Sequence, residues 1–362
     1  MSPITLLMIV FISISMLISL TKVEALTKRN PSVPAVFVFG DSTVDPGNNN
    51  FIGTTFRSDF PPYGQDLPDH MPTGRFSDGR LVTDFVASYA GVKDFIPPYL
   101  NPELSLDELM TGVSFASAGS GFDPLTPQIS STLSLPEQLE YFREYKTRMT
   151  QKIGKKKTDE LISKSVYVLS AGTNDFVVNY ITLPLRRQSY SVSQFENFIL
   201  QYLRQFIKAL MIEGARKMAI GGLPPIGCLP IVITLYSKSN PLQRGCIDSY
   251  SAIARSYNKL LTKELTNMAT QVSNHGIKLV YADIYNPVIT MIQQHDRFGF
   301  EKVTSGCCGT GYLEASFLCN YKSWVCNNAS KYVFFDSIHP TERTYYNVFM
   351  SLRPIIDYIL KD

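Results

Sequence analysis

The chain has 362 residues, of which 44% are hydrophobic and 18% are charged, and its formal net charge is +3. A chain of this length buries a sizeable core, and so low a charged fraction excludes disorder over most of it. The small net charge gives no basis for binding nucleic acid or an anionic membrane surface. No repeat, low-complexity tract or Gly/Ser-rich linker interrupts the chain, so we expect a single domain over residues 26–362.

The first residues, 1–25, are typical of a secretory signal peptide. Ile4 to Leu20 is almost entirely apolar or Ser/Thr, and Val23-Glu24-Ala25 is a small-x-small cleavage site. The alternative is an N-terminal membrane anchor, because the apolar run borders on spanning length. We expect cleavage after Ala25, which predicts a secreted, extracellular protein without stable membrane insertion.

Short apolar and β-branched runs indicate buried strands, and longer segments with helical spacing alternate with them. The strands are expected at Ala35–Phe39, Val166–Leu169, Lys217–Ile220, Lys278–Tyr281 and Tyr332–Phe335. The clearest helices are expected at Gln138–Arg148, Phe195–Ile212, Tyr250–Val272 and Thr341–Ile359. Alternating strands and helices predict an α/β fold, with a parallel sheet of about five strands covered on both faces.

Polar motifs follow three of the expected strands at their ends. These motifs are Gly40-Asp41-Ser42, Gly172-Thr173-Asn174-Asp175 and Asp336-Ser337-Ile338-His339. In open α/β sheets, ligands bind beyond the carboxyl ends of the strands. The sequence therefore predicts that these three loops meet at one edge of the sheet and form a site there.

The residue types in these loops point to nucleophilic catalysis. A serine hydroxyl is a weak nucleophile until a base takes its proton and a third group orients that base. Of the four histidines, only His339 follows a strand end with an aspartate, Asp336, three residues before it. Positions i and i+3 share a face, so Asp336 can orient the imidazole toward Ser42. The spacing fits equally well a helix cap at Asp336, with His339 a passive residue of the first turn.

Ser42 and Asn174 also have purely structural interpretations. A serine after a strand often caps a helix, and an asparagine after a strand often stabilises a turn. A Gly-x-Ser-x-Gly elbow is absent, so the serine does not stand in the usual α/β-hydrolase turn.

The cysteines agree with a secreted protein. An even number in an oxidising compartment predicts disulfides, with the pairing open. Zinc is the alternative, but the four clustered cysteines contain no C-x-x-C pair and no histidine. A glycosylation sequon occurs at Asn328-Ala329-Ser330. The six disulfide candidates are Cys228, Cys246, Cys307, Cys308, Cys319 and Cys326.

Four blocks follow one another along the chain: Gly40-Asp41-Ser42, Gly119 within residues 112–121, Gly172-x-Asn174-Asp175, and Asp336-x-x-His339-Pro340. They occur in the order found in the GDSL (SGNH) hydrolases, and the chain resembles plant GDSL esterases/lipases, in particular the extracellular lipases. Residues 39–51, 74–80 and 339–342 fit as well. The block around Gly119 departs from the usual pattern, because Ser114 replaces an asparagine and Ala118 replaces a glycine.

The resemblance implies a three-layer flavodoxin-like SGNH hydrolase fold and a role for each matching residue. Ser42 would be the nucleophile, His339 the base and Asp336 its orienting partner. The amides of Ser42 and Gly119, with the Asn174 side chain, would form the oxyanion hole.

The expected function is hydrolysis of carboxylic esters, either lipid or other acyl esters, through an acyl-enzyme at Ser42 and without metal or cofactor. The expected partner is a small-molecule or lipid ester, and no nucleic acid. One alternative is an O-acetyl esterase that acts on cell-wall polysaccharide. Another is a catalytically silent secreted binding protein. The sequence predicts neither the acyl chain length nor the oligomeric state.

Overall fold

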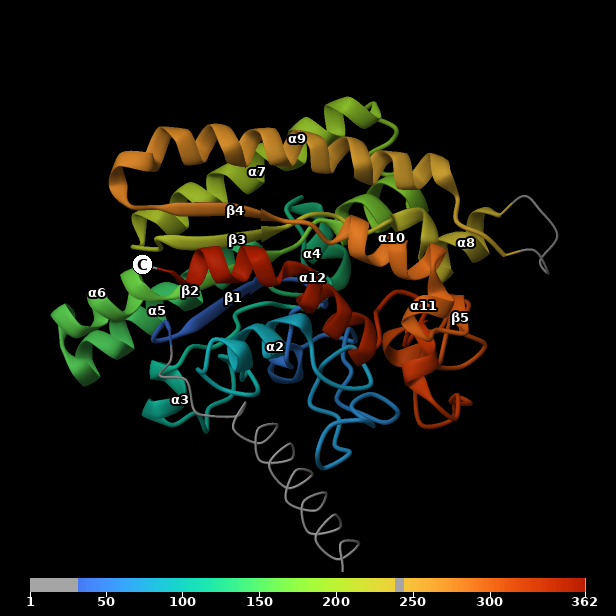
Figure 1. The fold of residues 1–362 in the computed structure, drawn as a ribbon, viewed down its shortest axis with the longest axis horizontal. Coiled ribbons are helices and arrows are strands. Elements are labelled where there is room, and N and C mark those ends of the chain that lie inside the picture. Colours follow the sequence, from blue (N-terminus) through green and yellow to red (C-terminus); the bar gives the residue numbers. More distant parts are fainter. Residues whose placement is uncertain (1–31, 238–243, 362) are drawn as a thin grey trace, which may run out of the picture.

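Strands and helices alternate along the chain, as the sequence predicts (Figure 1). The computed structural model describes residues 32–237 and 244–361, so the expected signal peptide lies outside the described residues. The strands are β1 (Val36–Gly40), β2 (Val166–Ser170), β3 (Lys217–Gly221), β4 (Lys278–Ala282), β5 (Lys302–Gly306) and β6 (Tyr332–Phe334). The main helices are α2 (Val82–Tyr89), α3 (Leu106–Met110), α4 (Leu125–Ser130), α5 (Leu135–Ile153), α6 (Lys155–Lys164), α7 (Val192–Ile212), α8 (Pro230–Tyr236), α9 (Asp248–Val272), α10 (Tyr285–Gln293), α11 (His295–Phe298) and α12 (Glu342–Leu360).

The main sheet contains the first four expected strands, in the order β1-β2-β3-β4 and all parallel. The strands start level with one another, with Val36 beside Val166, Val166 beside Lys217, and Lys217 beside Lys278. Because the strands are also of similar length, their carboxyl ends lie at one edge. The loop after β1 and the loop after β2 therefore emerge side by side.

An irregular segment, residues 112–117, extends the sheet on the free side of β1. The Val38 amide donates to the Val113 carbonyl (3.2 Å), and the Phe115 amide donates to the Val38 carbonyl (2.8 Å). Farther along, the Ser117 amide donates to the Gly40 carbonyl (3.0 Å). The spatial order is thus 112–117, β1, β2, β3, β4. Numbered along the chain this is the 2-1-3-4-5 order of flavodoxin-like folds, in which ligands bind where the strand order reverses.

The expected strand at Tyr332–Phe335 exists, but its assignment to the main sheet is wrong. As β6 it pairs with β5 in a separate two-stranded sheet. The chain after β6 turns back on it, and the Phe335 amide donates to the His339 carbonyl (2.7 Å). The sequence did not reveal β5 because Lys302–Gly306 is polar and mostly half-exposed, without the apolar run that marks the other strands.

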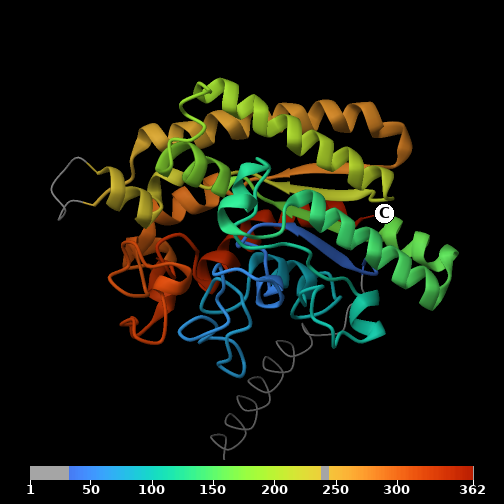
Figure 2. The ribbon, with the colours of Figure 1, turned by 180° about the vertical axis from the view of Figure 1, so that it is seen from behind.

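Helices cover both faces of the main sheet, which gives the expected three layers. Helices α2 and α12 lie in front of the sheet in Figure 1, and α5 and α7 lie in front of it in the reverse view of Figure 2. Strand β1 is buried along its whole length and alternates between the layers. Phe37 and Phe39 reach Phe142 of α5, with ring centroids 5.5 and 5.7 Å apart, whereas Val36 and Val38 cluster with Ala87 of α2.

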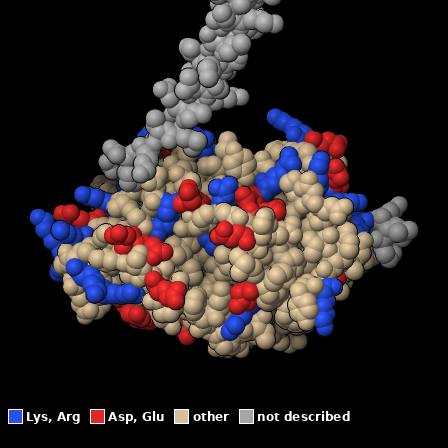
Figure 3. Space-filling view, turned by 90° about the horizontal axis from the view of Figure 1, so that it is seen from below, with Lys and Arg blue, Asp and Glu red and all other residues tan. Residues whose placement is uncertain are grey.

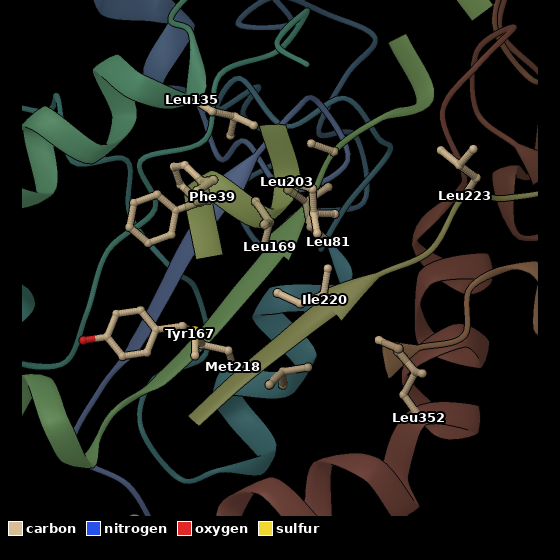
Figure 4. Close-up of a cluster of buried hydrophobic side chains, with 14 of the residues drawn as sticks. Phe39, Leu81, Leu135, Tyr167, Leu169, Leu203, Met218, Ile220, Leu223 and Leu352 are labelled. Atoms are coloured by element: carbon tan, nitrogen blue, oxygen red, sulfur yellow. The ribbon is translucent and has the colours of Figure 1, made fainter. Parts of the chain in front are cut away.

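The core between the sheet and the α5–α7 layer is continuous. Figure 4 shows Phe39, Tyr167 and Leu169 of the strands beside Leu135 of α5 and Leu203 of α7, and all of them are buried. Their burial on a parallel sheet explains why the strands appear in the sequence as unbroken apolar runs.

All six cysteines are paired, so the expectation of disulfides is confirmed. The bonds join Cys228 to Cys246, Cys307 to Cys326, and Cys308 to Cys319. The four clustered cysteines are bonded to one another, which excludes the alternative of a zinc site made from their thiolates. In the described ranges, no helix combines the length and the apolar character needed to cross a membrane.

A buried ion pair fixes residues 74–80 against α2. The Arg75 guanidinium donates to both carboxylate oxygens of Asp84, at 2.9 and 2.8 Å. Asp84 also accepts from the amides of Leu81 (2.9 Å) and Ile96 (2.9 Å). Both side chains are almost excluded from solvent, at 4% and 1% exposure. The segment that carries Phe76 is therefore fixed in place by the buried ion pair between Arg75 and Asp84.

We expect Arg75→Met to destabilise the protein by about 3–5 kcal/mol, because it leaves the Asp84 carboxylate buried without its counter-charge. The measurement is urea unfolding at neutral pH. Arg143→Met is the control, because Arg143 pairs with Glu140 and Glu213 at the surface and should cost about 1 kcal/mol or less. Equal losses for the two variants would contradict the interpretation of Arg75.

Candidate active site

The turn after β1 presents Ser42 at the edge of the sheet. Gly40 has φ of +139°, and a Cβ there would lie 1.9 Å from the Ser170 carbonyl oxygen of β2, so only glycine fits. The Asp41 carboxylate accepts from the backbone amide (3.0 Å) and the hydroxyl (2.8 Å) of Thr43, which closes the turn around Ser42. Burial raises the pKa of Asp41 to about 6.

Ser42, His339 and Asp336 form a hydrogen-bonded line. The Ser42 Oγ lies 2.8 Å from Nε2 of His339, and the other ring nitrogen, Nδ1, lies 2.6 Å from Oδ2 of Asp336. Asp336 is fully buried, and Ser42 and His339 are 7% and 5% exposed. The line has the geometry of nucleophile, base and orienting acid in serine hydrolases.

Asp336 is not a helix cap, so that alternative interpretation is wrong. The N-cap of α12 is Thr341, whose side chain accepts from the Thr344 amide. The Oδ1 of Asp336 accepts instead from the amides of Ile338 (2.8 Å) and His339 (2.7 Å). These bonds fold residues 336–339 into a tight turn that brings the imidazole back to the carboxylate.

Tyr63 is a fourth member of the line, and sequence analysis did not find it. Its hydroxyl donates to Oδ2 of Asp336 (2.7 Å) and accepts from the Ser316 amide (2.8 Å). Burial and the neighbouring Asp336 carboxylate raise the pKa of Tyr63 well above its usual value, so the phenol keeps its proton and donates it. One tyrosine among 20, in the loop Phe60-Pro61-Pro62-Tyr63, carries no local signal for this role.

Aromatic rings pack around His339 and Tyr63. Phe76 packs against the His339 ring, with centroids 4.8 Å apart. Tyr63 packs against Phe76 (5.6 Å) and Phe335 (5.5 Å). The imidazole therefore has little freedom to rotate away from Ser42.

The segment that carries Gly119 is tied to the loop after β1. The Asp45 carboxylate accepts from the Ala118 amide (2.9 Å), and the Asn49 side chain donates to the Ala118 carbonyl (2.9 Å). Gly119 has φ of +86°, and a Cβ there would lie 2.8 Å from Cβ of Ser130. Within the described ranges, the amides of Ser42 and Gly119 donate to no protein acceptor. Both are therefore available to an oxygen atom of a ligand.

Asn174 reaches across to the same segment from the loop after β2. Its Nδ2 donates to the Ser120 carbonyl (2.9 Å), and it makes no side-chain cap bond to the helix that follows it. The structure thus places Asn174 beside the residue next to Gly119, without a direct bond to Ser42. The contact is between loops, unlike the local turn bond that the structural interpretation requires.

Gln138, at the start of α5, connects the two loops and was not recognised from the sequence. Its side chain accepts from the Gly40 amide (2.9 Å) and donates to the Gly40 carbonyl (2.9 Å). The same side-chain nitrogen donates to the Ser120 hydroxyl (3.2 Å). Gln138 is fully buried. One amide therefore sets the spacing between the Ser42 turn and the Gly119 segment.

An apolar cavity of about 610 Å³ lies between α4, α5 and α7. It is bordered by Gly121 and Phe122, which follow Gly119, and by Leu135, Leu139 and Phe206. Ser42, His339 and Asp336 do not border this cavity, so it lies beside the hydrogen-bonded line and is not part of it.

The face of the molecule shown in Figure 3 carries no extended field of one charge. On the face shown in Figure 3, lysine and arginine residues are interspersed with aspartate and glutamate. Such a face does not select for a polyanion, in agreement with the small net charge.

Comparisons with known proteins identify the family of the chain. The family model described as GDSL-like Lipase/Acylhydrolase matches residues 36–352. GDSL esterase/lipase At5g45960 of Arabidopsis thaliana is 58% identical over 92% of this chain and 89% of its own length. GDSL esterase/lipase At2g31550 of the same plant is 44% identical over 96% of this chain and 95% of its own length.

We expect Tyr63→Phe to lower kcat about tenfold or more with little change in KM. The variant removes a hydrogen bond to the Asp336 carboxylate, worth about 1.5–3 kcal/mol, and loosens the orientation of His339. The measurement is steady-state hydrolysis of a chromogenic ester. Tyr145→Phe is the matched control, because it also removes a buried tyrosine hydrogen bond, to the Leu109 carbonyl (2.8 Å), but inside the core. An equal fall in kcat for both variants would show that Tyr63 has no specific role in positioning.

Proposed function

Because this chain belongs to the GDSL-like lipase/acylhydrolase family, it is a carboxylic ester hydrolase, and we propose that it works through an acyl-enzyme on Ser42. The observation that carries the proposal is the 2.8 Å contact between Ser42 Oγ and His339 Nε2, with Asp336 on the opposite ring nitrogen. The roles follow from this order: Ser42 is the nucleophile, His339 the general base, and Asp336 its orienting partner.

In the first half of the reaction, Ser42 Oγ attacks the ester carbonyl carbon while its proton passes to Nε2 of His339. The carbonyl electron pair moves onto the carbonyl oxygen and forms a tetrahedral intermediate. When this pair returns, the bond from carbon to the alcohol oxygen breaks, and His339 protonates the leaving alcohol. A water molecule then attacks the acyl-enzyme by the same route, and the carboxylic acid leaves.

The oxyanion would be held by the amides of Ser42 and Gly119 and by the Asn174 side chain. Both amides lack a protein acceptor among the described residues. The Asn174 Nδ2 carries two hydrogens, of which one is used by the Ser120 carbonyl, so one remains to donate. Donors fixed in advance by Gln138, Asp45 and Ser120 need little reorganisation when negative charge develops.

We further propose a secreted protein in which residues 26–362 form one domain after removal of residues 1–25. Three disulfides support this location, since such bonds persist in oxidising compartments. Asn328 is exposed and therefore accessible to glycosylation. A catalytically silent binding protein is a poorer interpretation, because it would have no need to keep a buried Ser–His–Asp line intact.

We expect Ser42→Ala to lower kcat by about 10³-fold or more while the melting temperature stays close to that of the wild type. The Ser42 hydroxyl is bonded to His339, so its loss removes the nucleophile and little packing. A fluorophosphonate probe should label the wild type and not the variant. A variant that keeps a tenth of the wild-type rate would disprove the assignment of the nucleophile.

For Asn174→Ala we expect kcat to fall by about 10²–10³-fold with little change in KM, because the lost donor acts mainly on the developing oxyanion. Asn179→Ala is the control. Asn179 is buried in the same segment and bonds Asp123 (3.1 Å) and Thr126 (2.8 Å), so its loss should lower stability and leave kcat unchanged. Kinetics and melting temperature are measured on the same preparations. A lower melting temperature with normal kcat for Asn174→Ala would remove it from the oxyanion hole.

A further inference from the structure

The segment between Cys307 and Cys326 exposes large apolar side chains, although the protein has a large hydrophobic core elsewhere. It follows β5 and lies at the periphery of the molecule (Figure 1). The most exposed are Phe317 (55%), Leu318 (52%), Tyr321 (74%) and Trp324 (64%). Together with Tyr312 and Leu313 we call these residues the 312–324 surface. Groups of exposed apolar residues on a soluble protein mark a binding surface.

The backbone beneath the 312–324 surface is firmly held. Disulfides join Cys307 to Cys326 and Cys308 to Cys319 across the segment. The Ser323 hydroxyl donates to the Leu318 carbonyl (3.2 Å), and the Asn320 amide donates to the Ser323 hydroxyl (3.1 Å). The apolar side chains are thus held in solvent by the covalent framework.

The charge of the surface indicates what covers it. From residue 315 to residue 327 the only charged side chain is Lys322, whose Nζ lies 5.5 Å from the centre of the Tyr321 ring. The carboxylate of Glu314, which precedes this stretch, is occupied by backbone amides, including that of Thr310 (2.9 Å). Tryptophan and tyrosine beside a lysine, with no carboxylate facing outward, are the residues that settle at the boundary between lipid headgroups and acyl chains.

The same segment is fastened to the catalytic line at two points. The Ser316 amide donates to the Tyr63 hydroxyl (2.8 Å), which in turn donates to Asp336. The Ser337 amide, next to Asp336 in the chain, donates to the Glu314 carbonyl (2.8 Å). The backbone that carries the 312–324 surface is therefore hydrogen-bonded directly to Tyr63 and to the turn that holds Asp336.

We propose that the 312–324 surface attaches the enzyme to a phospholipid–water interface, and that its substrates are esters of lipids held there. The proposal rests on the proposed function for its substrate class, but the attachment itself requires no turnover. Phe317, Leu318 and Trp324 enter the interface, and Lys322 contacts the lipid phosphates.

Trp324 makes a direct test possible, because it is the only tryptophan in the chain. The full-length secreted protein with Ser42→Ala is titrated with phosphatidylcholine vesicles, so that no lipid is consumed. We expect a saturable blue shift of tryptophan emission, and quenching by vesicles whose acyl chains are brominated. Adding Phe317→Ser and Leu318→Ser should weaken the apparent affinity at least tenfold. Every variant also carries Asn328→Gln, so that a glycan at that position cannot mask the surface.

Ile212→Ser is the matched control, because Ile212 is 82% exposed at the end of α7, outside the 312–324 surface. It should leave vesicle binding unchanged. Unshifted emission at saturating lipid, or equal weakening by Ile212→Ser, would overturn the proposal. The proposal would also fail if sedimentation showed a dimer that dissociates when Phe317 and Leu318 are changed to serine. The 312–324 surface would then be the interface between two copies of this chain.

A further comparison separates this inference from the proposed function. With Ser42 intact, the Phe317/Leu318 variant should hydrolyse a soluble short-chain ester at the wild-type rate and a vesicle-borne ester at least tenfold more slowly. Equal rates on vesicles would refute attachment. If the wild type hydrolysed neither ester, the hydrolytic function would be refuted. Attachment to the vesicles would then be tested by tryptophan fluorescence alone.

Discussion

The buried carboxylate of Asp336 is the constraint on which the rest of the site depends. A charge with no exposure to water must be satisfied by protein donors, and here four donors converge on it. Two are amides of its own turn, one is the His339 ring, and one is the Tyr63 hydroxyl. The turn after β6, the loop around Tyr63 and, through Ser316, the disulfide-linked segment are thereby held together.

Other buried carboxylates organise the oxyanion side in the same way. Asp45 accepts from the amides of Gly47, Asn48 and Ala118, and burial raises its pKa to about 6. Asp175 likewise accepts from the Phe122 amide next to the Gly119 segment, and burial raises its pKa to about 7. Each of these carboxyl groups fixes backbone in the loops around the site. The donors proposed for the oxyanion are therefore positioned by buried side chains, the carboxyl groups of Asp45 and Asp175 and the amide of Gln138.

The sequence predicts those features of the structure that leave a local pattern in the chain, and it misses those that depend on contacts between distant residues. The four strands of the main sheet and the long helices α5, α7 and α9 between them were predictable because burial leaves a local apolar pattern. Ser42, His339 and Asp336 could be singled out because each lies in a motif at the end of a strand, but that pattern fitted structural caps equally well, and their expected roles came from the resemblance to the GDSL hydrolases. Tyr63 and Gln138 could not be singled out, because each acts on a partner distant in the chain and neither leaves a local pattern. The edge segment 112–117 was missed because Gly112, Ser114 and Ser117 interrupt its apolar residues, so it lacks the unbroken apolar run that marks the other strands of the sheet.

The disulfide-linked segment after β5 combines two demands that oppose each other. Its backbone must hold the Ser316 amide against Tyr63, which requires a fixed conformation next to the proposed catalytic residues. Its side chains are apolar and exposed, which in a free loop would favour collapse onto the nearest core. Two covalent cross-links resolve the conflict, because they limit the conformations of the segment without using its side chains for packing. Catalytic geometry and a surface suited to a lipid interface can therefore share one short stretch of chain.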